Sequence, residues 1–357
     1  MLNDEPSERN SNLLPVNATG DVRFLSVASA GNDHRLGGNE APPAIISMFL
    51  GDEITDLLET ISSGKEYSNR KGNKLSTGVE SVPEIYEDTT DRNRTSPVAF
   101  TGNKFEFRSL GSSFNIACTN VMINAAVADT LNSYADKLEK VDKKDFKKVV
   151  LELIKAEYIA HKRIVFNGDN YADEWQTESA RRGLLNLKGT PEALSYYDRE
   201  ENVELFKRLK IYTPEEVRAR KEILLENYCK VINIEALTML EMVRRDILPA
   251  VSDYVANLCA NVAAKQAVCE ELPCTREKET IMTLAKLNEE VGGLAVKLEN
   301  ELAEIDLQDV SASSQAMAHN VVPLMEEIRE RVDKMETLTA SDYWPYPTYF
   351  DLLYSVN

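Results

Sequence analysis

The sequence has few of the residues that build metal sites and disulfide frameworks. It has three histidines and five cysteines in 357 residues, and no two cysteines have Cys-x-x-Cys spacing. A histidine-rich metal site, a zinc site and a disulfide framework are therefore disfavoured. We expect reduced, buried thiols at five positions that mostly lie in helical patterns: Cys118, Cys229, Cys259, Cys269 and Cys274.

The sequence also lacks a long apolar run and a basic charge balance. No run approaches the roughly 20 apolar residues of a membrane helix, and the N-terminus has no signal-peptide core. The formal net charge is −18, whereas nucleic acids and anionic membranes require clustered Lys and Arg. We therefore expect a soluble, cytoplasmic protein that binds neither nucleic acid nor membrane and holds any anionic substrate with local arginines.

The hydrophobic content of 43% allows one large or two ordinary domains. Residues 1–21 are polar and contain Pro and Gly, which predicts a disordered leader. Residues 22–30 have a strand-like alternation, and an apolar helix is predicted from near Ala44 to before Gly51. An exposed loop over residues 62–81 and a strand pair over residues 97–108 complete this part.

Helices are predicted for the rest of the chain. One covers residues 113–140, and nearly everything from Asp145 onward is helical. Thr190-Pro191 and the capping box formed by Thr213 and Glu216 predict two helix starts, and Pro249 should kink the long helix after Thr213. Three apolar stripes predict the core of an antiparallel bundle. They are Tyr228, Ile232, Ala236, Met239, Val243 and Ile247; Ile281, Leu284, Leu287, Val291, Leu294, Leu298 and Leu302; and Val321, Met325, Ile328, Val332 and Met335.

Two polar blocks carry the chemistry. Residues 31–46, GNDHRLGGNEAPPAII, place one arginine and one glutamate among glycine turns. Residues 93–108, NRTSPVAFTGNKFEFR, hold arginines and one glutamate on stiffer backbone. The strand period of two puts Lys104, Glu106 and Arg108 on one face and both phenylalanines on the other, so we expect a polar active-site face over an apolar core.

Together these blocks resemble glutamine synthetase of the long type III form. The resemblance continues through RIVFNGDNY at residues 163–171 and RRGL at residues 181–184 to the closing WPYPTY at residues 344–349. It implies an α+β fold in which the C-terminal part of the glutamine synthetase catalytic fold, an antiparallel sheet with helices, precedes a large helical region. The implied organisation is a leader over residues 1–21, the catalytic part over 22–140 and the type III helical region over 141–357.

The resemblance also implies an activity, which is the ATP-dependent ligation of ammonia to glutamate through a γ-glutamyl phosphate. Arg35 would grip the carboxylate of glutamate, Glu40 would bind and deprotonate ammonium, and Arg94 would contact ATP and stabilise the transferring phosphoryl group. Glu106 would bind Mg²⁺ or Mn²⁺, and Arg108 would lie near the reacting carboxylate. The family implies a homo-oligomer, a dodecamer of two stacked hexameric rings.

The sequence departs from the family in two respects. Ala99 stands where many relatives outside type III have a second nucleotide-contacting arginine. The resemblance implies that the other metal-binding glutamates and the metal-binding histidine belong to an upstream part, which we expect this chain to lack. An alternative is therefore a catalytically inactive fragment, or a helical interaction module that associates with a full-length synthetase.

Overall fold

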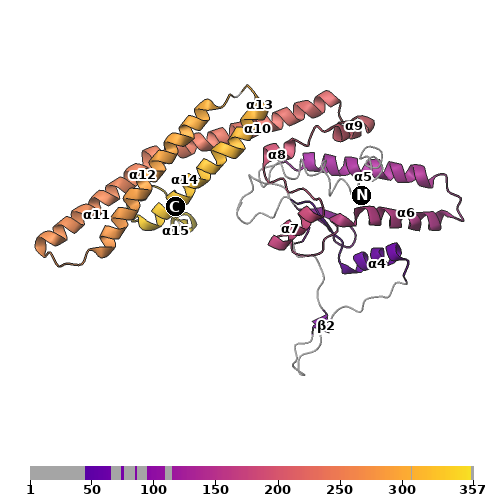
Figure 1. Ribbon diagram of the computed structural model, residues 1–357, viewed down its shortest axis with the longest axis horizontal. Helices are drawn as coiled ribbons and strands as arrows, with labels where there is room; N and C mark the ends of the chain where they lie inside the picture. Colours follow the sequence, from indigo (N-terminus) through magenta and orange to yellow (C-terminus); the bar gives the residue numbers. More distant parts are fainter. Residues whose placement is uncertain are drawn as a thin grey trace. The chain divides into compact units, whose positions relative to one another are not determined.

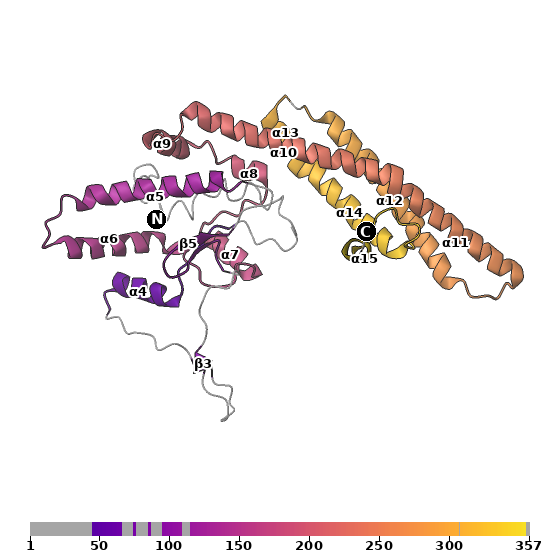
Figure 2. The same cartoon turned by 180° about the vertical axis from the view of Figure 1, so that it is seen from behind.

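The computed structural model describes residues 45–65, 74–75, 85–86, 95–108, 115–306 and 308–354. The chain divides into two compact units, residues 1–221 and residues 222–357. Helices dominate both units, and all the described strands belong to the first (Figures 1 and 2). A mostly helical chain with a small sheet is compatible with the predicted C-terminal region, whereas the catalytic fold and the domain boundaries stay predictions.

The larger described sheet has three strands in the order β1-β4-β5. β1 (Met48–Phe49) runs parallel to β4 (Val98–Phe100), and β4 runs antiparallel to β5 (Phe105–Phe107). The short β2 (Lys74–Leu75) and β3 (Ile85–Tyr86) form a separate antiparallel pair. The predicted strand pair over residues 97–108 is confirmed, but the three-stranded sheet is mixed rather than antiparallel. The long connection between β1 and β4 permits the parallel pairing, which a tight turn would exclude.

The helix predicted from Ala44 to before Gly51 is wrong, because β1 lies in this stretch. Ile45 and Ile46 are almost completely buried. A short apolar run containing β-branched residues is also typical of a buried strand, and its periodicity alone does not decide between the two. The helix instead follows Gly51, whose φ of 77° suits glycine, and α4 covers Asp52–Ser63.

Five further α-helices cover most of the rest of the first unit. They are α5 (Ala117–Leu138), α6 (Phe146–His161), α7 (Asp173–Arg181), α8 (Thr190–Leu194) and α9 (Glu200–Arg208), with one 3₁₀ turn at Lys162–Ile164. α6 lies between α4 and α5, as both views of the chain show (Figures 1 and 2). The predicted helix over residues 113–140 is confirmed for its described part, and so is the start near Thr190.

The second unit is a bundle of long helices. Its elements are α10 (Pro214–Met242, which begins in the first unit), α11 (Leu248–Val268), α12 (Thr275–Glu304), α13 (Val310–Ala316), α14 (Val322–Leu338) and α15 (Tyr349–Tyr354). α12 packs against both α11 and α14. The three predicted stripes meet in one core, in which Leu284, Val291, Leu298 and Val321 have no exposed surface. The predicted bundle core is therefore confirmed.

Two π-helical turns interrupt these long helices at related places. The first covers Val243–Ile247 and the second Met317–Val321. Each ends two residues before a proline, Pro249 or Pro323. In the first turn the Leu248 amide donates to the Val243 carbonyl, five residues back. The sequence predicted a kink at Pro249; the structure accommodates that proline with a wide turn, after which the helix continues to Val268.

The cysteines and the longest helix refine two expectations. All five cysteines are free thiols, but Cys259 and Cys269 are exposed, so burial was wrongly predicted for these two.

The continuous helix over residues 214–268 is long and apolar enough to cross a membrane by length and composition, with a mean hydropathy of 1.2 in its most apolar stretch. Core helices can have the same length and composition, and 11% of this most apolar stretch is buried here.

Candidate functional site

The candidate site is built on the β4-β5 hairpin. The Thr101 amide donates to the Lys104 carbonyl over 2.9 Å, and Gly102 takes a φ of 95° that a residue with a side chain rarely adopts. β4 is the central strand, and its Ala99 pairs with Phe49 on one side and Glu106 on the other. Ala99 has no exposed surface, so a long cationic side chain does not fit at this position without rearrangement.

Lys104, Glu106 and Arg108 form a row on one face, as the strand period predicted. The Glu106 carboxylate accepts a hydrogen bond from the Lys104 ammonium. Its Oε2 also accepts from Arg108 Nη2 at 2.5 Å and Nε at 3.1 Å. These contacts, Lys104 first and Arg108 second, lower the pKa of Glu106 to about 2. The row therefore holds a permanent carboxylate between two cations.

The opposite side of β5 is less buried than expected. The Phe105 ring packs against that of Phe100, with 5.2 Å between the ring centroids, but Phe105 remains 58% exposed. Phe107 is half-buried. The expected apolar core under the polar face is thus only partly formed among the described residues, because β5 is the outer strand of the three.

The segment RIVFNGDNY at residues 163–171 extends this sheet. The Phe166 amide donates to the Met48 carbonyl over 2.9 Å, and Val165 bridges to Met48 in parallel. The Ser47 hydroxyl donates to Ser96 at 2.7 Å, and Ser96 donates to the Phe166 carbonyl at 2.8 Å. Segments far apart in the sequence therefore fix the start of β4, the strand that carries the hairpin.

Asn167 links the same segment to the start of α4. Its Oδ1 accepts from the Leu50 and Gly51 amides at 3.1 Å each, and its Nδ2 donates to the Thr55 hydroxyl at 2.9 Å. No role for this side chain could be predicted from the sequence, because its partners lie more than 110 residues away. The only feature of the nearby sequence that pointed to Asn167 was its place in the turn-forming Asn-Gly-Asp motif at residues 167–169.

Trp175 anchors the far end of the segment. Its ring stacks on Phe166 with 3.7 Å between centroids and 6° between planes, and the Arg182 guanidinium lies 5.2 Å from the Trp175 ring. Arg182 also donates to the Val165 carbonyl at 2.9 Å. The RIVFNGDNY and RRGL motifs are thus packed together.

The described residues do not by themselves fit a divalent metal ion. Within the ranges that the structure describes, no group of three or more His, Cys, Asp or Glu side chains could hold one. Glu106 offers a single carboxylate that two cations already hold, whereas Mg²⁺ requires six oxygen ligands. The assignment of Glu106 as a metal ligand stays a prediction.

The remaining candidate residues lie outside the described residues. These are Arg35 and Glu40 of the first block and Arg94 of the second. Of the five candidates, the structure brings together Glu106 and Arg108, and it adds Lys104 beside them.

The described residues form a mostly helical chain with a small mixed sheet, and Lys104, Glu106 and Arg108 lie in a row on one face of that sheet. Residues 149–266 match the family model of the glutamine synthetase C-terminal domain. The chain is 40% identical to a glutamine synthetase of Butyrivibrio fibrisolvens over 97% of its length. It is 35% identical to the type-3 glutamine synthetase of Dictyostelium discoideum over 95% of its length, and 34% identical to a glutamine synthetase of Bacteroides fragilis over 96%. The resemblance to type III glutamine synthetase is confirmed.

The chain spans about half the length of these relatives. It covers 49% of the Butyrivibrio protein, 47% of the Dictyostelium protein and 48% of the Bacteroides protein. What those complete proteins do therefore applies to this chain only as a proposal.

Proposed function

We propose that this chain forms the C-terminal part of a type III glutamine synthetase, which ligates ammonia to glutamate with ATP through a γ-glutamyl phosphate. The observation that carries the proposal is the identity of 34–40% over 95–97% of the chain to proteins named glutamine synthetase. Cytoplasmic residence, and assembly of complete subunits into a dodecamer, are part of the same proposal.

The row on β5 suits this chemistry. The reaction must hold a glutamate carboxylate and transferring phosphoryl oxygens, all of which are anionic, so it requires positive charge fixed in place. In the row, Glu106 fixes the guanidinium of Arg108 through two of its nitrogens. A planar guanidinium that is already oriented can meet a carboxylate with little loss of side-chain freedom.

The other candidate residues have assigned roles in the proposal. Arg35 grips the substrate carboxylate, and Arg94 stabilises the phosphoryl group. Glu40 takes a proton from ammonium and so generates the neutral nucleophile. ATP is a substrate that converts the carboxylate oxygen into a phosphate, which is the better leaving group.

A second candidate function is a noncatalytic module that docks onto a complete synthetase. The matched domain, residues 149–266, lies in the helical part of the chain. The second unit also has a core of its own, built from α10 to α14. A helical unit with its own core can be retained without the chemistry of the sheet.

The decisive experiment measures incorporation of ¹⁵N-ammonium into glutamine by mass spectrometry. The purified chain, shown to be folded by circular dichroism, is assayed alone and with the half of the Butyrivibrio protein to which it does not align. We expect ATP-dependent glutamine formation in the mixture, with at least a 100-fold loss for Arg108→Gln. Arg244→Gln is the matched control, because Arg244 pairs with Glu299 on the exposed surface of the second unit.

The outcomes separate the two functions. Turnover that requires Arg108 supports the ligase. No turnover, combined with stable binding of the folded chain to the complete Butyrivibrio synthetase, supports the noncatalytic module and overturns the ligase proposal.

A further inference from the structure

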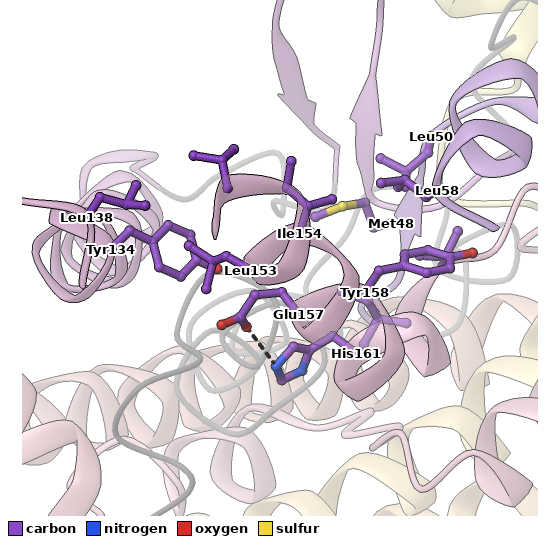
Figure 3. Close-up of a pocket in the computed structure, with 13 residues that line it drawn as sticks. Met48, Leu50, Leu58, Tyr134, Leu138, Leu153, Ile154, Glu157, Tyr158 and His161 are labelled. Atoms are coloured by element: carbon purple, nitrogen blue, oxygen red, sulfur yellow. Dashed lines mark ion pairs between the residues drawn. The ribbon is translucent and has the colours of Figure 1, made fainter. Parts of the chain in front are cut away.

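A cavity in the first unit has no role in the proposed function. Its volume is about 370 Å³, and it lies between β1, α4, α5 and α6 (Figure 3). Its wall is almost entirely apolar and includes Met48, Leu50, Leu58, Leu138, Leu153 and Ile154. This volume is within the range of small-molecule binding sites, roughly 300–1,000 Å³.

The polar groups of the cavity come mainly from one turn of α6. Glu157 and His161 face each other, with 3.6 Å between Glu157 Oε2 and His161 Nε2, as Figure 3 shows. From α5, the Tyr134 hydroxyl hydrogen-bonds to Glu157, and Lys137 Nζ lies 3.9 Å from Glu157 Oε1. The Tyr158 hydroxyl is engaged by Glu59 of α4 at 2.9 Å. The cavity therefore has an apolar body and one polar end.

The polar end favours a positively charged group. Glu157 lines the cavity itself, and its side chain is only 12% exposed. The distances to Lys137 and His161 exceed those of direct hydrogen bonds, so the carboxylate retains capacity to accept one. Glu59 and Asp56 add negative charge near Tyr158, whereas the Lys137 side chain is 43% exposed to solvent. A ligand carboxylate would be repelled here, and an ammonium group would be attracted.

The apolar walls favour a hydrocarbon body. Away from Glu157, the apolar lining offers water few hydrogen-bonding partners. Side chains that line an unfilled space lose their dispersion contacts. An apolar occupant restores those contacts, and its polar end completes the hydrogen bonding of Glu157.

We propose that this cavity is a binding site for a small apolar molecule that carries one primary amine, with the amine held by Glu157 and the hydrocarbon body held by α4, α5 and α6. This site is independent of the proposed ligase chemistry. It uses none of the residues of the β5 row.

Titration calorimetry of the full chain with n-octylamine tests the proposal. We expect one molecule bound per chain, with octanoate binding at least tenfold more weakly. Glu157→Gln should weaken octylamine binding about tenfold, whereas Glu152→Gln, an exposed position on the same helix, should leave it unchanged. Leu153→Trp should fill the cavity and abolish binding. Ile159→Trp, at a position on α6 that is 53% exposed and outside the cavity, should not.

Two further measurements keep the test decisive. Leu58→Phe fills the cavity from α4 and substitutes for Leu153→Trp if that variant does not fold. Absence of octylamine binding to the folded chain, or binding that neither filling variant reduces, overturns the proposal. Equal affinity for octylamine and octanoate also overturns it, because it leaves Glu157 without a role.

Discussion

At the scale of single residues, the ionisation of Glu106 reports on the integrity of the candidate site. Its pKa of about 2 results from Lys104 first and Arg108 second. We expect Lys104→Gln and Arg108→Gln each to raise this pKa toward 4.5, the former by more. Carbon-detected NMR titration of the side-chain carboxyl measures it. Glu178, whose pKa is also lowered to about 2, by Arg181 and Arg182, should not change in either variant.

The lowered pKa of Glu106 also makes the stability of the fold depend on pH. Because the pKa of Glu106 is lower in the folded than in the unfolded chain, its ion pairs stabilise the fold above pH 4.5, and this contribution is lost as the pH falls toward about 2. A hairpin that is less protected from hydrogen exchange at neutral pH than at pH 3 would contradict a stabilising role for the ion pairs of Glu106. Hydrogen exchange of the Thr101 amide is a suitable probe, since that amide closes the hairpin.

Asn167 provides a second prediction for a single side chain. Asn167→Ala removes the acceptor for two backbone amides and the donor to Thr55, and it leaves partly buried polar groups unpaired. We expect a loss of about 2 kcal/mol in the stability of the first unit, measured by urea unfolding monitored at Trp175. Asn261→Ala removes an exposed side-chain contact with Asn257 and should cost less than about 0.5 kcal/mol.

Single residues also show what a sequence can predict. The shared face of Lys104, Glu106 and Arg108 follows from the two-residue period of a strand, which is a local rule. The role of Asn167 does not, because its contacts form only when residues 50–55 are brought to it by folding. The sequence therefore predicted which side chains share a face of the strand, but it did not predict the long-range hydrogen bonds of Asn167 that hold the neighbouring segments in place.

At the scale of elements, the start of α10 is set by the capping box. The Glu216 amide donates to the Thr213 hydroxyl at 3.2 Å, and the Thr213 amide donates to the Glu216 carboxylate at 2.8 Å. We expect Thr213→Ala to cost about 1 kcal/mol, seen as faster hydrogen exchange in the first turn of α10. Thr238→Ala, an exposed position within the same helix, should leave that turn unchanged.

Elements with long, regular patterns were predicted better than short ones. The stripe from Leu284 to Leu298 repeats over several turns of α12, and every turn supports the same answer. The run from Ile45 to Leu50 is too short for its period to decide, and its strand forms because β4 is present to pair with it. Tertiary pairing, rather than local preference, determines that element.

At the scale of the whole molecule, the two units have separate cores. Trp175 is buried in the first unit, and Leu284 in the second. We expect Trp175→Ala and Leu284→Ala each to destabilise their own unit by roughly 3–4 kcal/mol. Residue-resolved hydrogen exchange should show each loss confined to residues 1–221 or 222–357 respectively. Uniform destabilisation of both units by either variant would mean that they unfold as one.

The sequence predicted the helical second part of the chain, but it did not predict this division. The helix over residues 214–268 is continuous in pattern across residue 221, and no change in composition marks the point at which contacts separate. The boundary depends on which side chains meet in space, which a pattern along one helix does not contain.

The two π turns alter how residues should be counted along the bundle. A wide turn holds about one residue more than an α-turn, so it rotates everything after it by roughly 100° relative to an uninterrupted helix. Deleting one residue from 243–247 would convert the wide turn into an ordinary α-turn. In an ordinary α-helix the ring of Pro249 would clash with a carbonyl of the preceding turn. We therefore expect the contact face of α11 to keep its position against α12 only if the deletion is combined with Pro249→Ala. The extra residue of each wide turn and the proline that follows it therefore depend on each other, so a viable deletion or insertion at these places must change both.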